Sequence, residues 1–512
     1  MKQTAEVTGD VHREKSLRLK LLRDVYLYAG ASYAAGVIVF ASHVILRNLL
    51  GPKDYGTWSL LLLILGYATS GHLGLLNGLQ RQLPLYYGKK DFEKAGISQN
   101  SACTVIFLTS ILMGVLLVLF SVVFQHKYSS EFIWGLRILS GIVVLTQIHA
   151  IYITLLQTRQ DFVLLSKIKV LFPSLTAALS VLMVVKFGLY GMYAGNLLAI
   201  ACLIGYVYTA TNFNYKVMLN TQEVLYVLRV GVSLFILATM ASIFFTLDSI
   251  VIANFMGTTE LGYYSIALLA QNMFLYIPKA VSYNMYPRTL ERYGQRGDVN
   301  DVTDYVIKPS LAMAYLSPCI LGVFYLSTEP GIRFFMPKYT DGIMATKILL
   351  LGAFFKALYP TFQHLLIAHG RIIQLTLLHI IPTLLTGILC LLSVKLRFGI
   401  EGIALAMSVG LFVSCTLVVL YAHSYLSTGV INHLKMLGSL YAPFFLTLLA
   451  LLSIDKMVGP HSALVVQGDV SLVLVKLLLL ALFSIPLLFY IDKQTGTISK
   501  ILALTKELIA TR

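Results

Sequence analysis

Four charged side chains lie inside apolar stretches that are long enough to cross a membrane: Arg137, Asp248, Lys279 and Lys356. A charged group at membrane depth is costly unless it is paired or hydrated, so each is a candidate functional residue. Arginine binds phosphate through paired hydrogen bonds and lysine acts as a point charge, so the three cations are candidates for binding an anion. Asp248 could pair with a cation or take up a proton or a sodium ion.

Three further residues belong to this candidate set. Arg47 and Arg81 lie at the ends of apolar stretches and are candidate substrate-binding residues, and His72 is a candidate ion-coupling residue. Each cation could instead be a salt-bridged or snorkelling helix residue. No two cysteines or histidines have the spacing of a metal site, and no phosphate-binding G-x-x-x-x-G-K-[ST] loop occurs. We therefore expect no catalytic residue, no metal and no cofactor.

The composition predicts an all-α integral membrane protein. Of the 512 residues, 57% are hydrophobic and 12% are charged, with a mean hydropathy of +0.79, whereas soluble domains carry about 25% charged residues. Spanning helices need about 20 apolar residues each, and fourteen such runs can be recognised. They lie near 25–46, 57–79, 101–124, 132–157, 164–185, 188–210, 224–253, 263–287, 304–327, 343–368, 372–395, 400–426, 435–454 and 470–491.

Lysine and arginine predict the orientation of these helices. The segments on the side of the termini hold 25 of these residues, against 10 on the opposite side. Cytoplasmic loops carry the excess of positive charge, so both termini are expected in the cytoplasm and the chain in the inner membrane. The net charge of +16 follows from this bias and from anionic lipid headgroups, so it does not require a nucleic-acid partner.

The chain contains an internal repeat at an offset of about 206–211 residues. Gly51–Ser59 aligns with Gly257–Ser265, sharing both glycines, an acid and a final aromatic-serine pair, and Phe187-Gly188 aligns with Phe398-Gly399. The glycines suit tight turns between antiparallel helices. Six helices per repeat would insert both halves the same way up, with a shared cavity between them. The predicted divisions are a cytoplasmic N-terminus at 1–24, six-helix bundles at 25–215 and 216–430, and two extra helices with a tail at 431–512.

The stretch 46–95 resembles the opening signature of polysaccharide-exporting flippases, the Wzx-type O-antigen and capsule transporters of the multidrug/oligosaccharidyl-lipid/polysaccharide superfamily. The residues that carry the resemblance are Leu50-Gly51-Pro52, Asp54-Tyr55-Gly56, Leu73-Gly74-Leu75, Arg81 and Gly88-Lys89-Lys90. The segment 334–352 is similar to the family's second half. Relatives commonly carry an acid where this chain has His72, so any ion coupling at that position would differ here.

The resemblance implies a transporter, not an enzyme, that flips an oligosaccharide linked to polyprenyl pyrophosphate by alternating access. Its partners would be the lipid-linked glycan, membrane lipids and a polysaccharide polymerase or synthase complex. On this reading the pyrophosphate is the charged part of the cargo. Arg137, Lys279 and Lys356 are then expected to face one hydrated cavity and to contact it.

Four alternatives stay open. A multidrug extruder or a lipid II flippase would keep the fold and change the cargo. A membrane-embedded glycan polymerase or ligase usually needs a large outward loop, and the predicted loops are short. A non-transporting scaffold of a synthase complex is the fourth.

Overall fold

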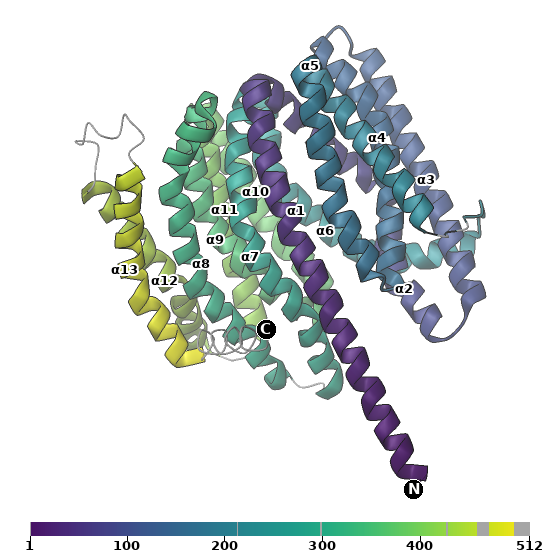
Figure 1. The fold of residues 1–512 in the computed structure, drawn as a ribbon. Coiled ribbons are helices and arrows are strands. Elements are labelled where there is room, and N and C mark those ends of the chain that lie inside the picture. The colour runs from purple at the N-terminus through teal and green to yellow at the C-terminus, as the bar shows by residue number, and fades with distance from the viewer. Residues whose placement is uncertain are drawn as a thin grey trace. The chain divides into compact units, whose positions relative to one another are not determined.

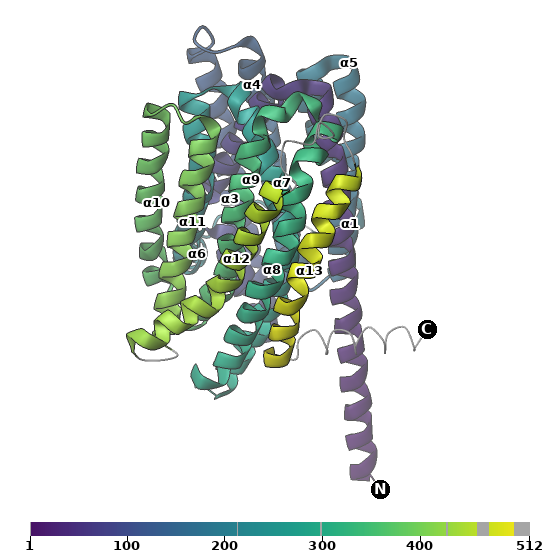
Figure 2. The ribbon, with the colours of Figure 1, turned by 90° about the vertical axis from the view of Figure 1, so that its left-hand side faces the viewer.

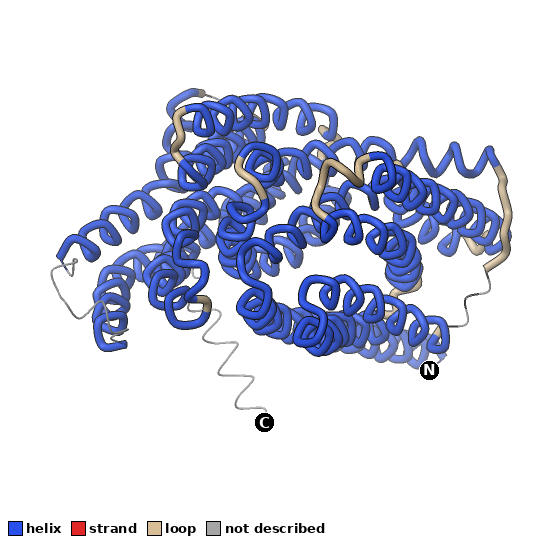
Figure 3. The backbone as a smooth tube through the Cα atoms, turned by 90° about the horizontal axis from the view of Figure 1, so that it is seen from above, coloured by secondary structure: helices blue, strands red, loops and turns tan. Residues whose placement is uncertain are grey.

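A computed structural model describes the backbone of residues 2–211, 213, 215–296, 299–425, 429–457 and 470–495. These residues form helices joined by short loops, with no strand among them (Figure 3). The elements, labelled in Figure 1, are α1 Lys2–Ala68, η1 Thr69–His72, α2 Leu75–Gly88, α3 Phe92–Val123, α4 Ser130–Thr158, α5 Phe162–Ala210, α6 Thr221–Phe255, α7 Thr258–Arg296, α8 Val299–Phe335, η2 Pro337–Gly342, α9 Ile343–Ala368, α10 Ile372–Lys395, α11 Gly399–His423, α12 Val430–Met457 and α13 Val470–Thr495.

The predicted all-α membrane fold is confirmed, and most of the described residues of each of the fourteen apolar runs lie in helices. Ten helical segments of the described residues are long and apolar enough to cross a membrane. Two of them, Gly30–His72 and Phe162–Ala210, each overlap two predicted runs. The chain is therefore a multi-pass membrane protein. The runs outside these ten segments lie in α13, whose apolar part is shorter, and in α7, which carries several polar residues.

Two of the long helices bend at glycines. Within α1, Gly51 has φ 76°, and within α5, Gly188 has φ 55°. Both values lie in the left-handed region that favours glycine. The bends separate the first predicted helix from the second, and the fifth from the sixth, so the sequence-based division at Phe187-Gly188 is confirmed.

The predicted second helix, 57–79, is wrong as one continuous element. It is interrupted between Thr69 and Gly74, where Gly74 has φ 95°. A close approach of α2 to α6 explains the break: a Cβ atom on Gly74 would lie 2.9 Å from the carbonyl oxygen of Gly231, and one on Gly231 would lie 2.8 Å from the nitrogen of Gly78. Small residues spaced in this way let membrane helices pack backbone against backbone.

The two repeated glycine segments contact each other reciprocally. A Cβ atom on Gly56 would overlap the carbonyl of Thr258, and one on Gly262 would overlap the carbonyl of Pro52. Thr258 and Gly262 are the repeat counterparts of Pro52 and Gly56 at the offset of 206. Exchanging the two segments therefore converts the Gly56–Thr258 contact into the Gly262–Pro52 contact. Such reciprocal contacts are expected where a local twofold axis relates two segments.

The chain divides into two compact units. Unit 1 comprises the residues up to Leu50 together with Thr57–Ile236, and unit 2 comprises Gly51–Gly56 and the chain from Leu237 onward. In unit 1, α3, α4 and α5 pack in sequence and α2 lies against α3 and α4 (Figure 1). The core that joins α2, α3, α4 and α6 contains Leu75, Leu79, Leu83, Ala95, Ala102, Ile106, Leu155 and Val227.

In unit 2, α9 is the central helix and packs against α7, α8 and α11. The predicted extra helices, α12 and α13, both lie along α8 (Figure 2). Phe354 of α9 stacks on Phe444 of α12 with ring centroids 4.6 Å apart. The unit boundary falls inside α6, after Ile236, and the proposed domain limits at 215 and 430 stay predictions.

Candidate functional site

A cavity of about 180 Å³ lies in unit 2 between α6, α7 and α9. Helix α7 contributes Pro278 and Lys279 to its wall, and α9 contributes Lys356 and Tyr359. The ring of Phe245, from α6, closes another part of the wall. Lys279 and Lys356 therefore line the same cavity, although 77 residues separate them in the sequence; their role in binding a ligand stays a prediction.

The ammonium group of Lys356 is held by neutral partners. It donates a hydrogen bond of 2.9 Å to Oε1 of Gln271 and lies 4.4 Å from the centre of the Phe245 ring. Gln271 is 3% exposed, and its Nε2 is buried without a hydrogen-bond partner. The amide therefore fixes the position of the lysine while its own N–H donors stay available.

Neither lysine of the cavity forms an ion pair with a described residue. The two ammonium groups repel one another, and Lys279 retains an exposed side chain. Because no carboxylate neutralises them directly, their combined charge acts on whatever enters the cavity. Two positive charges within a small, largely apolar cavity suit a ligand with two negative charges.

Asp248 lies beside this cavity but does not line it. Its Oδ2 accepts a hydrogen bond of 2.7 Å from the hydroxyl of Tyr264, and its Oδ1 accepts hydrogen bonds from the backbone and the hydroxyl of Ser249. The carboxyl group is 1% exposed and attracts Lys356 across a longer distance. Three donors hold the carboxyl group of Asp248 in place near the lysine pair.

Arg137 has its contacts in unit 1. Its Nε donates to Oγ of Ser121, 3.3 Å away on α3, and its guanidinium carbon lies 4.9 Å from the centre of the Trp134 ring. Arg137 does not line the lysine cavity. The prediction that all three cations contact one ligand stays a prediction.

The remaining candidates are spread over unit 1. Arg47 is 3% exposed and donates to the His43 carbonyl, whereas Arg81 is exposed on α2. His72 lies in the break between α1 and α2, where its Nδ1 accepts the N–H of Gly74. This hydrogen bond gives the His72 ring a local role in shaping the turn.

Sequence reasoning missed the neutral part of the cavity wall. Tyr359, Pro360 and Gln363 follow Lys356 at spacings of three, four and seven residues, which places them on one helix face. This spacing in the sequence could have identified the three residues as neighbours of Lys356 on the cavity wall. Gln271 of α7 accepts the hydrogen bond of Lys356 of α9, so it joins two helices beside the cavity.

The sequence matches the model of the polysaccharide biosynthesis protein family over residues 45–336, more than half of the chain. The chain belongs to this family. Curated protein sequences give no match. The family match confirms the resemblance seen in the 46–95 stretch.

Solved structures of the same fold come from the MOP superfamily. The lipid II flippase MurJ in an inward closed conformation is 15% identical, with a TM-score of 0.65 over 92% of this chain and 99% of that one. An inward-facing multidrug resistance MATE transporter is 16% identical, with a TM-score of 0.62 over 78% of this chain and 95% of that one. A MOP transporter from Pyrococcus furiosus is also 16% identical, with a TM-score of 0.55 over 81% and 96%. At these identities the similarity shows the fold alone.

Proposed function

We propose that this protein flips an oligosaccharide linked to polyprenyl pyrophosphate across the inner membrane, with both termini in the cytoplasm. Transport proceeds by alternating access and involves no covalent chemistry. The flipped glycan serves the assembly of O-antigen, capsule or another exported polysaccharide. Membership of the polysaccharide biosynthesis family and the MOP fold support this proposal.

The observation that carries the proposal is the lysine pair of unit 2. Pyrophosphate is the only strongly charged part of such a cargo, and Lys279 and Lys356 together supply two positive charges. Their partners are a neutral amide and an aromatic ring, so binding does not have to break an ion pair. The free amide N–H of Gln271 adds a donor next to Lys356.

The cargo would divide between two environments. The pyrophosphate and the sugars would enter the cavity, where Gln363 of the wall can contact hydroxyl groups. The polyprenyl tail would stay in the lipid, because transfer of an apolar chain into water is unfavourable. The protein therefore has to lower the free-energy barrier to crossing the membrane only for the charged headgroup.

The test is flipping of a fluorescent, short-chain polyprenyl-pyrophosphate sugar in proteoliposomes. Hydrogen bonds to charged groups contribute about 1.5–3 kcal/mol each, and 1.4 kcal/mol is tenfold. Removing either charge, in Lys279→Gln or Lys356→Gln, should therefore slow flipping at least tenfold, and the double variant should be slower still. Arginine at both positions should keep part of the activity.

Lys476→Gln is the matched control, because it removes a lysine from a helix of unit 2 outside the cavity. Wild-type flipping by the double variant would refute the proposed site. Flipping of cationic drugs, with no transport of the sugar lipid, would instead support a multidrug extruder.

A further inference from the structure

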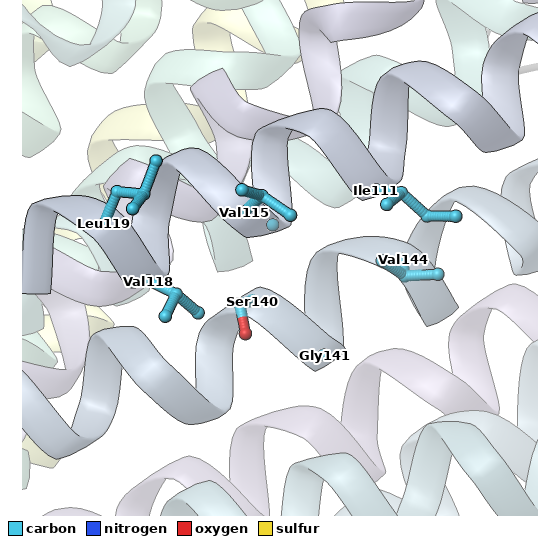
Figure 4. Close-up of a pocket in the computed structure, with 8 residues that line it drawn as sticks. Ile111, Val115, Val118, Leu119, Ser140, Gly141 and Val144 are labelled. Atoms are coloured by element: carbon cyan, nitrogen blue, oxygen red, sulfur yellow. The ribbon is translucent and has the colours of Figure 1, made fainter.

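A second cavity lies in unit 1. It is an open groove of about 350 Å³ between α3 and α4. Ile111, Val115 and Leu119 form the wall from α3, and Ser140, Gly141 and Val144 form the wall from α4 (Figure 4). Val115 is 49% exposed and Leu119 is 53% exposed, so the groove opens onto the surface of a membrane-spanning pair of helices.

Small residues create this groove. A Cβ atom on Gly114 would lie 3.1 Å from the carbonyl oxygen of Ser140, so the two helices approach closely at that level. The hydroxyl of Ser140 donates to the carbonyl of Arg137 in its own helix, which leaves the groove without a free hydroxyl donor. An apolar groove with satisfied polar groups suits a hydrocarbon chain and offers water no partner.

One end of the groove carries a positive charge. Arg137 lies one helical turn before Ser140 on α4, and its partner Ser121 lies two residues beyond Leu119 on α3. The guanidinium group has five N–H donors, and Ser121 takes one of them. Among the described residues no carboxylate pairs with Arg137, so its remaining donors can bind an anionic ligand.

Aromatic side chains mark this end as the membrane–water interface. Phe120, Phe124, Tyr128 and Phe132 form a chain of ring contacts where α3 ends and α4 begins. Trp134 is 48% exposed next to them and lies under the Arg137 guanidinium group. Tyrosine and tryptophan gather at the level of lipid headgroups. Arg137 lies seven residues into α4, about 10 Å from its start.

We propose that this groove is a binding site for one anionic phospholipid of the membrane. Its phosphate contacts Arg137 over Trp134, and one acyl chain lies along the groove between α3 and α4. A single guanidinium matches the single charge of a phosphodiester better than a pyrophosphate. Because the groove opens to the membrane, its occupant comes from the most abundant anionic lipid around it. This site assigns Arg137 a ligand other than the transported headgroup.

The test counts lipids bound to the purified full-length protein by native mass spectrometry, with phosphatidylglycerol and phosphatidylcholine as probes. The wild-type protein should retain phosphatidylglycerol at least tenfold more strongly than phosphatidylcholine. Arg137→Gln should remove most of this preference. Its control is Arg159→Gln, at the other end of α4, which also loses an arginine–aromatic contact, that with Phe213.

A second pair of variants tests the acyl-chain part of the groove. Val115→Phe should lower the affinity for both lipids, because the larger side chain fills the groove. Val122→Phe is the matched control: it changes the same residue type, on the same helix and with 50% exposure, but outside the groove.

Equal retention of the two lipids by the wild-type protein, or full retention of phosphatidylglycerol by Arg137→Gln and Val115→Phe, would overturn the proposal. So would displacement of phosphatidylglycerol by an equimolar amount of polyprenyl pyrophosphate, because the groove would then belong to the transport substrate. The double variant at Lys279 and Lys356 should still bind phosphatidylglycerol normally. That result separates this site from the flipping site.

Discussion

The reciprocal contact of the repeated glycines leads to a sharp prediction about stability. In Gly56→Ala, the new Cβ atom would lie 2.7 Å from the carbonyl carbon of Thr258 and 2.8 Å from the nitrogen of Gly262. Carbon atoms pack favourably at about 3.5–4.0 Å, and the carbonyl oxygen of Thr258 lies closer than its carbon, so the two segments would have to separate by at least roughly 1 Å. The obstructing atoms belong to the backbone, which cannot rotate away as a side chain can.

The expected magnitude follows from two opposing effects. Overpacking usually costs about 1–3 kcal/mol, and a backbone clash belongs at the upper end. Alanine is better than glycine inside a helix by about 1 kcal/mol, which offsets part of that loss. The net destabilisation of Gly56→Ala should therefore be about 2 kcal/mol, seen as a lower apparent melting temperature of the purified protein in detergent.

The control lies in the same helix. Gly66 has no atom within 4 Å of the position that a Cβ would take, so Gly66→Ala should be neutral or stabilising by up to about 1 kcal/mol. Gly262→Ala should match Gly56→Ala, and the double variant should lose less than the sum of the two, because both substitutions open the same contact. A melting temperature of Gly56→Ala at or above that of Gly66→Ala would refute the reciprocal contact.

Three further predictions concern single contacts and topology. Tyr264→Phe removes a hydrogen-bond donor from the buried carboxyl group of Asp248 and should destabilise the protein by about 1–3 kcal/mol. In the Asp248→Asn background the same substitution should cost clearly less. Equal losses of stability in both backgrounds would argue against the hydrogen bond. Tyr359→Phe removes the 2.6 Å hydrogen-bond partner of the buried His379 and should destabilise the protein by a similar free energy. An unchanged melting temperature would contradict this prediction. Cysteines at Lys89 and Lys127, which flank α3, should react with an impermeant maleimide from the cytoplasmic and the outer side respectively; labelling of both from one side would refute the orientation.

The helices could be predicted from the sequence because a membrane-spanning helix can be recognised from its length and apolar composition alone. The interruption at 69–74 could not, since 57–79 is apolar on both sides of it. The break depends on the approach of Gly74 and Gly78 to Gly231, which is more than 150 residues away in the chain. Hydropathy indicates whether a segment lies in the membrane or in water. Where that segment bends depends on the helix against which it packs.

For the candidate site, the individual cations could be predicted from the sequence but their arrangement could not. A charged residue in an apolar run stands out because burial is costly, which is how Lys279 and Lys356 were found. Their presence in one cavity depends on how α7 and α9 pack, which no local pattern encodes. The same reasoning grouped Arg137 with them, although its described contacts lie on α3 and α4.

The partners of the membrane cations separate structural charges from functional ones. Lys347 lies 3.0 Å from the carboxylate of Glu329 and Lys476 lies 2.8 Å from that of Asp455, so each has an ion-pair partner within the protein. Lys356 and Arg137 are held differently, each by one neutral oxygen and one aromatic ring. A neutral oxygen orients the cation without cancelling its charge, and the ring gives it a weak favourable contact in place of water.

Such an arrangement leaves a cation without a direct ion pair, which is costly in a membrane, so an anionic ligand would stabilise it. It therefore indicates two places where a negatively charged ligand completes the structure. The pair of lysines offers two charges in a cavity, which suits a headgroup that enters and leaves. The single arginine at the end of an open apolar groove, beside Trp134, suits a lipid that stays.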